Sequence, residues 1–253
     1  MRKEIVLISI LLFWGISAIQ AYEHNFLNLI SPTELTDLEN EITISHRFLG
    51  AVDDEPFDTF FGMDVGANTG FFLRKALIHS LEAKVGYTRL KKSYHLEASF
   101  KFTPMSFPVQ AQANIRYFSF DEVSQEKRRN NFLYLLAVQN DPLWERIILN
   151  TNIGYDGYYE RLVNGFGLGV ILFDNLTLLS EYYPVWDRDS ASERVRTYLG
   201  DYDAFAVGLR LDTYGHQFTF LLGNGTGMSP REQSLGTNDK KDLKFGFNLQ
   251  RRF

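Results

Sequence analysis

The chain has 253 residues, a formal net charge of −5 and no cysteine. The lack of cysteine excludes a lipoprotein anchor and a disulfide scaffold, and the mild negative charge gives no reason to expect a nucleic acid partner. Aromatic residues make up 15% of the chain, although the mean hydropathy is −0.19. Both features are expected of a membrane barrel, because only one face of each of its strands is apolar.

The first residues have the pattern of a secretory signal peptide. Arg2 and Lys3 precede an apolar run from Ile5 to Phe13, and small residues follow as far as Ala21. A spanning helix needs roughly twenty apolar residues, which is more than this run provides. We predict that residues 1–21 are a signal peptide removed after Ala21, with cleavage after Ala18 as the alternative.

Residues 22–40 show no clear alternation of apolar and polar residues. We expect this stretch to be an N-terminal periplasmic segment. Two forms remain open, an extended tail and a short helix placed in the mouth of a barrel.

From Glu41 onward the chain divides into about twelve stretches in which apolar and polar residues alternate, as in strands with one apolar face. The stretch 93–102 has the clearest pattern, with Leu96, Ala98 and Phe100 alternating with Glu97 and Ser99. The predicted strands run over residues 41–48, 67–76, 80–90, 93–102, 108–118, 131–139, 144–154, 162–173, 176–186, 203–212, 216–223 and 243–253.

The predicted connections alternate in length. Those after even-numbered strands are short, such as Asp174 with Asn175, and those after odd-numbered strands are mostly long, with Lys91 and Lys92 as an exception. This asymmetry is typical of outer-membrane barrels with both termini in the periplasm. We therefore predict an all-β, closed antiparallel transmembrane barrel over residues 41–253, in the outer membrane of a Gram-negative bacterium. The rival interpretation is a soluble β-sandwich, and the signal peptide and loop asymmetry count against it.

The last strand carries a resemblance to a whole class of proteins. Leu243, Phe245, Phe247 and Leu249 alternate with polar residues or glycine, and the last residue is Phe253. A C-terminal strand that ends in Phe resembles the signature of bacterial outer-membrane β-barrels, whose insertion machinery reads that strand. The resemblance implies that Phe253 is a membrane-insertion signal. It also implies two partners, outer-membrane lipid and the barrel-insertion machinery.

Several short motifs add a second resemblance. They are ISHRF at 44–48, FFGMD at 60–64, GAN at 66–68, GYTRLKKSY at 86–94, GNGTGM at 223–228 and GFNLQRRF at 246–253. With these motifs the chain resembles, over residues 32–253, a family of predicted membrane-bound β-barrel proteins of unknown function found mainly in Bacteroidetes. The resemblance implies the fold and the location, and it carries no established activity.

The polar faces of the predicted strands carry charges that we expect to face the lumen. The basic ones are Arg47, Arg74, Lys84, Arg116, Arg210, Lys244 and Arg252, and the acidic ones are Glu82, Glu97, Glu181 and Asp212. Cross-strand ion pairs are expected, because an unpaired charge there would lose hydration. Two interpretations remain open. One is a small pore for polar solutes or ions whose selectivity these residues set. The other is a non-conducting structural or docking barrel with a salt-bridged lumen, which serves periplasmic or surface partners.

A band of glycines interrupts the predicted inner wall. Gly165, Gly167 and Gly169 share one face of their strand, opposite apolar residues. A band without side chains indicates either open space or a place where a loop or the N-terminal segment packs closely. The sequence leaves both open.

Aromatic residues near the strand ends are expected to form girdles at the two membrane interfaces. Trp144 is predicted at the periplasmic rim and Trp186 at the outer rim, with Tyr159 and Tyr182 near the latter.

Catalysis is the least favoured function. An outer-membrane phospholipase of similar strand number uses Ser, His and Asn on its outer surface, so His46, on the predicted lipid face, is the position to check. No neighbouring lipid-facing Ser and Asn join His46 in the predicted register, and we expect no enzyme, no catalytic residue and no cofactor.

The acidic loops and one Gly-rich run remain. Asp53 and Asp54 are expected to be solvated rather than to bind Ca²⁺, so no metal is predicted. The run from Gly223 to Gly227 is followed by neither the Lys-Ser/Thr pair nor the helix of a phosphate loop. It predicts a mobile outer loop.

Overall fold

The structure is a computed structural model that describes residues 26–32, 35, 39–78, 80–102, 108–122, 127–140, 142–186, 188–189 and 191–253. The predicted signal peptide, residues 1–21, lies outside the described residues.

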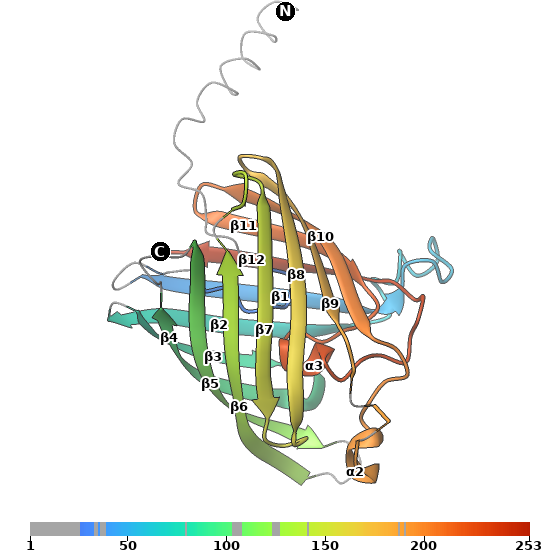
Figure 1. Cartoon of the computed structure of the whole chain (residues 1–253). Coiled ribbons are helices and arrows are strands. Elements are labelled where there is room, and N and C mark those ends of the chain that lie inside the picture. The colour runs from blue at the N-terminus through green and yellow to red at the C-terminus, as the bar shows by residue number, and fades with distance from the viewer. Residues whose placement is uncertain are drawn as a thin grey trace, which may run out of the picture.

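In the described part of the chain, twelve strands form one closed barrel in which each strand pairs antiparallel with the next and β12 pairs with β1 (Figure 1). The strands are β1 (Asn40–Ala51), β2 (Ala67–Ile78), β3 (Leu81–Thr88), β4 (Ser93–Phe102), β5 (Val109–Glu122), β6 (Lys127–Asn140), β7 (Ile147–Asp156), β8 (Arg161–Phe173), β9 (Leu176–Tyr183), β10 (Ala204–Thr213), β11 (His216–Gly223) and β12 (Lys244–Arg252). The predicted fold is confirmed. Among the connections that the structure describes are three short helical turns, η1 (Leu90–Lys92), α2 (Glu193–Arg196) and α3 (Pro230–Gln233).

The barrel wall is apolar outside and polar inside. Along β4, Leu96 and Phe100 are 55% and 54% exposed, whereas Glu97 and Ser99 between them are each 5% exposed. This pattern is the reverse of a soluble protein and suits a barrel whose outer surface faces lipid, where closure also satisfies every strand's backbone groups. Within the described residues, none of the helices has the length and apolar character required to cross a membrane.

Two predicted boundaries were wrong for identifiable reasons. The predicted long loop 119–130 is largely strand, because Asp121 lies opposite Arg128 in the β5–β6 register and forms an ion pair with it at 2.9 Å. Charges that suggest a loop in the sequence therefore pair across two strands. The predicted strand at Trp144 begins only at Ile147, since Trp144 has a positive φ of 49° and lies in the preceding turn.

The start of β1 and the end of β12 meet at one end of the barrel. The backbone N–H of Asn40 donates to the carbonyl of Phe253, and the N–H of Phe253 donates back, both at 3.0 Å. The helical turn α2 lies at the opposite end, where the longer connections are found (Figure 1). We refer to these as the terminal end and the long-loop end.

Candidate functional site in the barrel lumen

A stretch of chain that precedes the first strand lies inside the barrel. We call residues 26–32 the lumenal segment; Phe26, Leu27 and Leu29 are at most 5% exposed. The described residues of this segment form no helix. The side of the membrane from which the segment enters remains a prediction.

The carboxylate of Glu181, on β9, holds the lumenal segment by its backbone. It accepts hydrogen bonds from the N–H groups of Leu27, Asn28 and Leu29 at 2.7, 2.9 and 2.9 Å, and from the Tyr183 hydroxyl at 2.7 Å. Consecutive N–H groups that converge on one oxyanion form a strong anchor, since each bond involves a full charge. Glu181 therefore binds the chain's own backbone rather than a lumenal cation.

Other wall residues bind the remaining polar groups of the segment. Arg47 donates to the Leu27 carbonyl at 3.2 Å and to the Asn28 side-chain oxygen at 2.8 Å. Asn152 accepts from the Ile30 N–H and donates to the Ile30 carbonyl, both at 2.8 Å. The wall thus satisfies the N–H groups of residues 27–30 and the carbonyls of Leu27 and Ile30, which a buried backbone requires.

The glycine band of β8 makes room for the segment. A Cβ added at Gly167 would lie 2.4 Å from a ring carbon of Phe26, and one at Gly165 would lie 2.6 Å from Leu29. Of the two interpretations left open by the sequence, close packing of the N-terminal segment is the one that the structure shows. Phe26 and Leu29 join an apolar cluster with wall residues of β7, β9, β10 and β11. We call this side, β7 to β11, the apolar wall.

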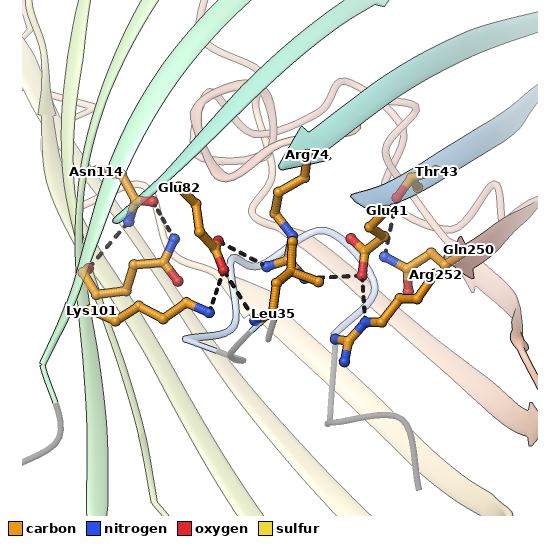
Figure 2. Close-up of polar contacts among 10 residues, drawn as sticks. Leu35, Glu41, Thr43, Arg74, Glu82, Lys101, Asn114, Gln250 and Arg252 are labelled. Carbon is orange, nitrogen blue, oxygen red and sulfur yellow. Dashed lines mark hydrogen bonds and ion pairs between the residues drawn. The ribbon is translucent and has the colours of Figure 1, made fainter. Parts of the chain in front are cut away.

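The opposite side of the lumen carries a row of charges at one level. Strand register places these six residues next to each other in turn, and we call them the charge belt: Arg252 on β12, Glu41 on β1, Arg74 on β2, Lys84 on β3, Glu97 on β4 and Arg116 on β5. Glu41 bridges Arg74 at 2.9 Å and Arg252 at 3.1 Å (Figure 2). Glu97 is bonded to Arg116. The strands from β12 through β1 to β5 form the charged wall.

A second row of charges lies beside the belt. Glu82 binds Lys101 at 2.6 Å and Arg74 at 3.5 Å, and it accepts the backbone N–H of Leu35 at 3.1 Å (Figure 2). One carboxylate thus joins two cations of the wall to the chain that precedes β1.

The remaining predicted lumen charges lie away from the belt. Arg210 is 1% exposed and bridges Asp212 at 3.2 Å near the terminal end of β10. Lys244, at the start of β12, pairs with Asp239 of the preceding loop. Charge pairing is therefore distributed along the lumen, and only the belt spans several strands at one level.

The β11–β12 connection covers the long-loop end of the lumen. The guanidinium of Arg231, on α3, lies 3.9 Å from the centre of the Phe118 ring and 4.9 Å from that of Tyr159, and it bridges Asp156 at 2.6 Å. A cation over aromatic faces and beside a buried carboxylate is held firmly. We call α3 with its flanking residues 228–235 the cap.

The run from Gly223 to Gly227 was predicted to be a mobile outer loop with no helix after it. The structure corrects this prediction, because the helical turn α3 follows the run and packs in the cap. Met228, Arg231 and Gln233 are buried, and the Ser229 hydroxyl accepts from the backbone N–H of Glu232. The Ser-Pro-Arg-Glu sequence at 229–232 is a capping box with proline at the first helical position. This signal was present in the sequence and could have predicted the helix.

Of the four residues predicted to form the aromatic girdles, three are exposed and one is buried, and the place of the exposed ones at the membrane interfaces stays a prediction. Trp144, Tyr182 and Trp186 are 82%, 48% and 66% exposed. Tyr159 was wrongly assigned: it is 2% exposed, because its loop folds over the lumen and its ring packs beside Arg231. Burial, opposed by the Arg231 charge, raises the pKa of the Tyr159 hydroxyl above its usual value, which keeps it neutral.

No catalytic arrangement is formed around His46. Its ring stacks on Phe247 with centroids 5.2 Å apart, and its two register partners on β2 and β12 are Thr69 and Phe247. Neither neighbour supplies the Ser or Asn of the phospholipase arrangement. Among the residues that the structure describes, no group of three His, Asp or Glu side chains could hold a metal ion.

A cavity of about 90 Å³ separates the lumenal segment from the charge belt. The segment lines one side, Arg74, Lys84 and Arg116 line the other, and the cap contributes Met228. The cavity has room for several water molecules. The lumen is therefore filled by peptide on the apolar wall and left partly open on the charged wall.

Comparison with known proteins agrees with this description. Residues 150–253 match the family described as Membrane bound beta barrel domain (DUF5777), a domain of unknown function. The resemblance seen in the sequence is thus confirmed for that part of the chain. An origin in Bacteroidetes stays a prediction. No curated protein sequence matches the chain.

Solved structures share the barrel. The KdgM porin is similar with a TM-score of 0.54 and 8% identity, over 85% of this chain and 99% of that chain. The structure of KdgM in complex with disordered oligogalacturonate is similar with a TM-score of 0.52 and 10% identity, over 84% of this chain and 99% of that chain. Outer membrane phospholipase A from Escherichia coli has a TM-score of 0.44 and 12% identity, over 85% of this chain and 90% of that chain. At these identities the likeness to KdgM shows the fold alone.

Proposed function

We propose that this protein is a small outer-membrane channel for polar solutes or ions, held closed by its lumenal segment. The observation that carries the proposal is that the segment forms no part of the barrel's strand pairing. The closed ladder of β1 to β12 would persist if the segment moved away from the apolar wall. The space left would be bounded by the charge belt, as in a selective pore.

A fold shared with the KdgM porin is consistent with this proposal. KdgM has been solved in complex with disordered oligogalacturonate, a carbohydrate whose sugar units carry carboxylate groups. Accommodation of a charged, water-soluble molecule is thus compatible with a barrel of this fold.

The second candidate is a non-conducting structural or docking barrel. Its support is that Glu41, Glu82 and Glu97 each pair with a lumenal cation, and that the cap covers the long-loop end. A lumen filled in this way stabilises the barrel and leaves its loops for periplasmic or surface partners. A phospholipase-like hydrolase is a weaker third candidate, since His46 has neither a Ser nor an Asn as register partner.

The proposal includes a location in the outer membrane with both termini in the periplasm. Asn40 and Phe253 are hydrogen-bonded to each other, so both ends of the barrel emerge on one side. Outer-membrane lipid and the barrel-insertion machinery are the expected partners, the latter through Phe253. No nucleic acid partner is expected.

Single-channel conductance in a planar bilayer tests the proposal. The chain from residue 22 onward is compared with its Glu181→Gln variant, which keeps the shape of the side chain but removes the charge that holds three N–H groups. We expect rare openings in the unsubstituted chain and frequent openings in the variant. Glu193→Gln, at an exposed position of α2, is the matched control. Insertion of both proteins without any conductance would favour the structural barrel.

A further inference from the structure

Lys84, a cation of the charge belt, has no carboxylate partner. The ammonium of Lys84 lies 5.0 Å from the centre of the Phe72 ring, and among the residues that the structure describes no Asp or Glu lies within ion-pair distance of it. Its register neighbour Glu97 is engaged by Arg116. Lys84 thus forms no ion pair of its own within the described part of the barrel.

The register of β2 and β3 sharpens this imbalance. Arg74 lies directly opposite Lys84, so two cations face each other on neighbouring strands. Like charges in this position destabilise a sheet. The charge belt as a whole contains four cations and two carboxylates. The belt therefore carries an excess of positive charge around Lys84, because the one carboxylate beside it, Glu97, is already bonded to Arg116.

The same place borders the lumenal cavity. Arg74, Lys84 and Arg116 all line it, together with the neutral amide of Gln112 and the ring of Phe72. The carboxylates of Glu41 and Glu97 line it too, and each is already bonded to an arginine of the belt. Amide and cationic donors around a small space, with one apolar side, are suited to an oxyanion attached to a short carbon skeleton.

We propose that the lumen contains a binding site for a small oxyanion, free or as the acid group of a small solute, at Lys84 between Arg74 and Arg116. The ligand supplies the negative charge that the belt lacks and forms a charge-assisted hydrogen bond with the Lys84 ammonium. This inference deepens the proposed function, and it rests on that function only for passage of the solute through the barrel. Binding itself requires the cavity alone.

Isothermal titration calorimetry on the refolded chain in detergent tests the site. The probes are acetate, as a free oxyanion, and D-glucuronate, as the acid group of a solute, with D-glucose as the neutral counterpart. Each is titrated into the unsubstituted chain and into Glu181→Gln, so that access is tested with the segment held and with the segment released. We expect saturable binding of at least one anion and none of D-glucose.

Three substitutions assign the binding to Lys84. Lys84→Met keeps the length of the side chain without its charge and is expected to weaken binding at least about tenfold. Lys84→Arg is expected to retain it. Lys92→Met, at an exposed lysine near the long-loop end, is the control and should bind as the unsubstituted chain does. Circular dichroism and heat-modifiable gel mobility establish that each variant is folded.

The outcomes separate this inference from the proposed function. No saturable anion binding in either background, or equal binding by a folded Lys84→Met, would overturn the site. Lys84-dependent binding without conductance would support the site and reject the channel. Conductance of Glu181→Gln without anion binding would support the channel and reject the binding site.

Discussion

The two walls of the lumen solve opposite problems with the same strand geometry. On the apolar wall, Gly165 and Gly167 remove side chains, and a peptide segment fills the space that they leave. On the charged wall, Arg74, Lys84 and Arg116 keep long side chains that extend toward a cavity. The comparison teaches that this barrel divides its interior, with one side packed against the chain itself and the other lined by charges around a cavity.

The division also separates two uses of carboxylates. Glu181, on the apolar wall, binds backbone N–H groups of the lumenal segment, whereas Glu41 and Glu97, on the charged wall, bind cations of neighbouring strands. A buried carboxylate needs several donors in either case. If the walls are functionally distinct, substitutions on each should have different consequences.

The largest effect on the lumen is expected from Glu181→Ala, which removes the anchor of the lumenal segment on the apolar wall. Three backbone N–H groups lose their acceptor, and each unsatisfied donor costs roughly 1–3 kcal/mol. We expect the segment to detach, with amide hydrogen exchange of residues 27–29 faster by at least about a hundredfold. Glu193→Ala serves as the control. Unchanged exchange in a folded Glu181→Ala protein would contradict the anchoring role.

A smaller effect is expected from adding one methyl group to the glycine band. In Gly167→Ala the new Cβ would lie 2.4 Å from Phe26, and relief of such overpacking costs roughly 1–3 kcal/mol. In Gly169→Ala, on the same face of β8, the nearest atom would lie at 3.1 Å. Open probability in the bilayer should rise for the first variant and much less for the second. Equal behaviour of the two would show that the band does not seat the segment.

On the charged wall we expect a change of selectivity rather than of closure. Arg116→Ala frees Glu97, but Lys84 lies opposite Glu97 in the β3–β4 register and can pair with it. The substitution should therefore lower the free energy of unfolding by only about 1 kcal/mol, which is less than the cost of an unpaired buried charge. In the Glu181→Gln background, reversal potentials should shift toward cation preference. An unaltered reversal potential would place the ion pathway away from the belt.

The smallest effect concerns the long-loop rim, outside both walls. Burial alone would raise the pKa of Asp203, but hydrogen bonds from the Tyr182 hydroxyl and the Val185 N–H, with the charge of Arg188, hold it below its usual value. A depressed carboxyl pKa stabilises the fold above the unfolded-state value of about 4 and loses that effect as pH falls below it.

Limited proteolysis of the α2 loop between pH 6 and pH 3 tests this expectation. Cleavage should increase below about pH 4 in the unsubstituted chain, and Asp203→Asn should flatten the change. A lumen variant such as Lys84→Met should leave the rim profile intact, which keeps the rim distinct from the two walls.

Much of the fold could be predicted from alternation alone. The predicted bounds of β4 and β11 are those observed. In β4 the apolar and polar residues alternate without interruption, which makes its bounds clear in the sequence. The β5–β6 hairpin was predicted too short, since Asp121 and Arg128 resemble loop residues until they are placed opposite each other. The helix α3 was missed although its capping box is a local signal.

The sequence by itself determined the class of protein. A period of two in apolar residues and the alternating lengths of the connections indicate a membrane barrel, because both are local properties of the chain. Only the tertiary structure decided what fills the lumen. The bonds of Glu181 to residues 27–29 join positions more than 150 apart in sequence. The lack of an ion-pair partner for Lys84 depends on the register of three neighbouring strands. Such relations arise only when the barrel closes and brings distant strands around one small space.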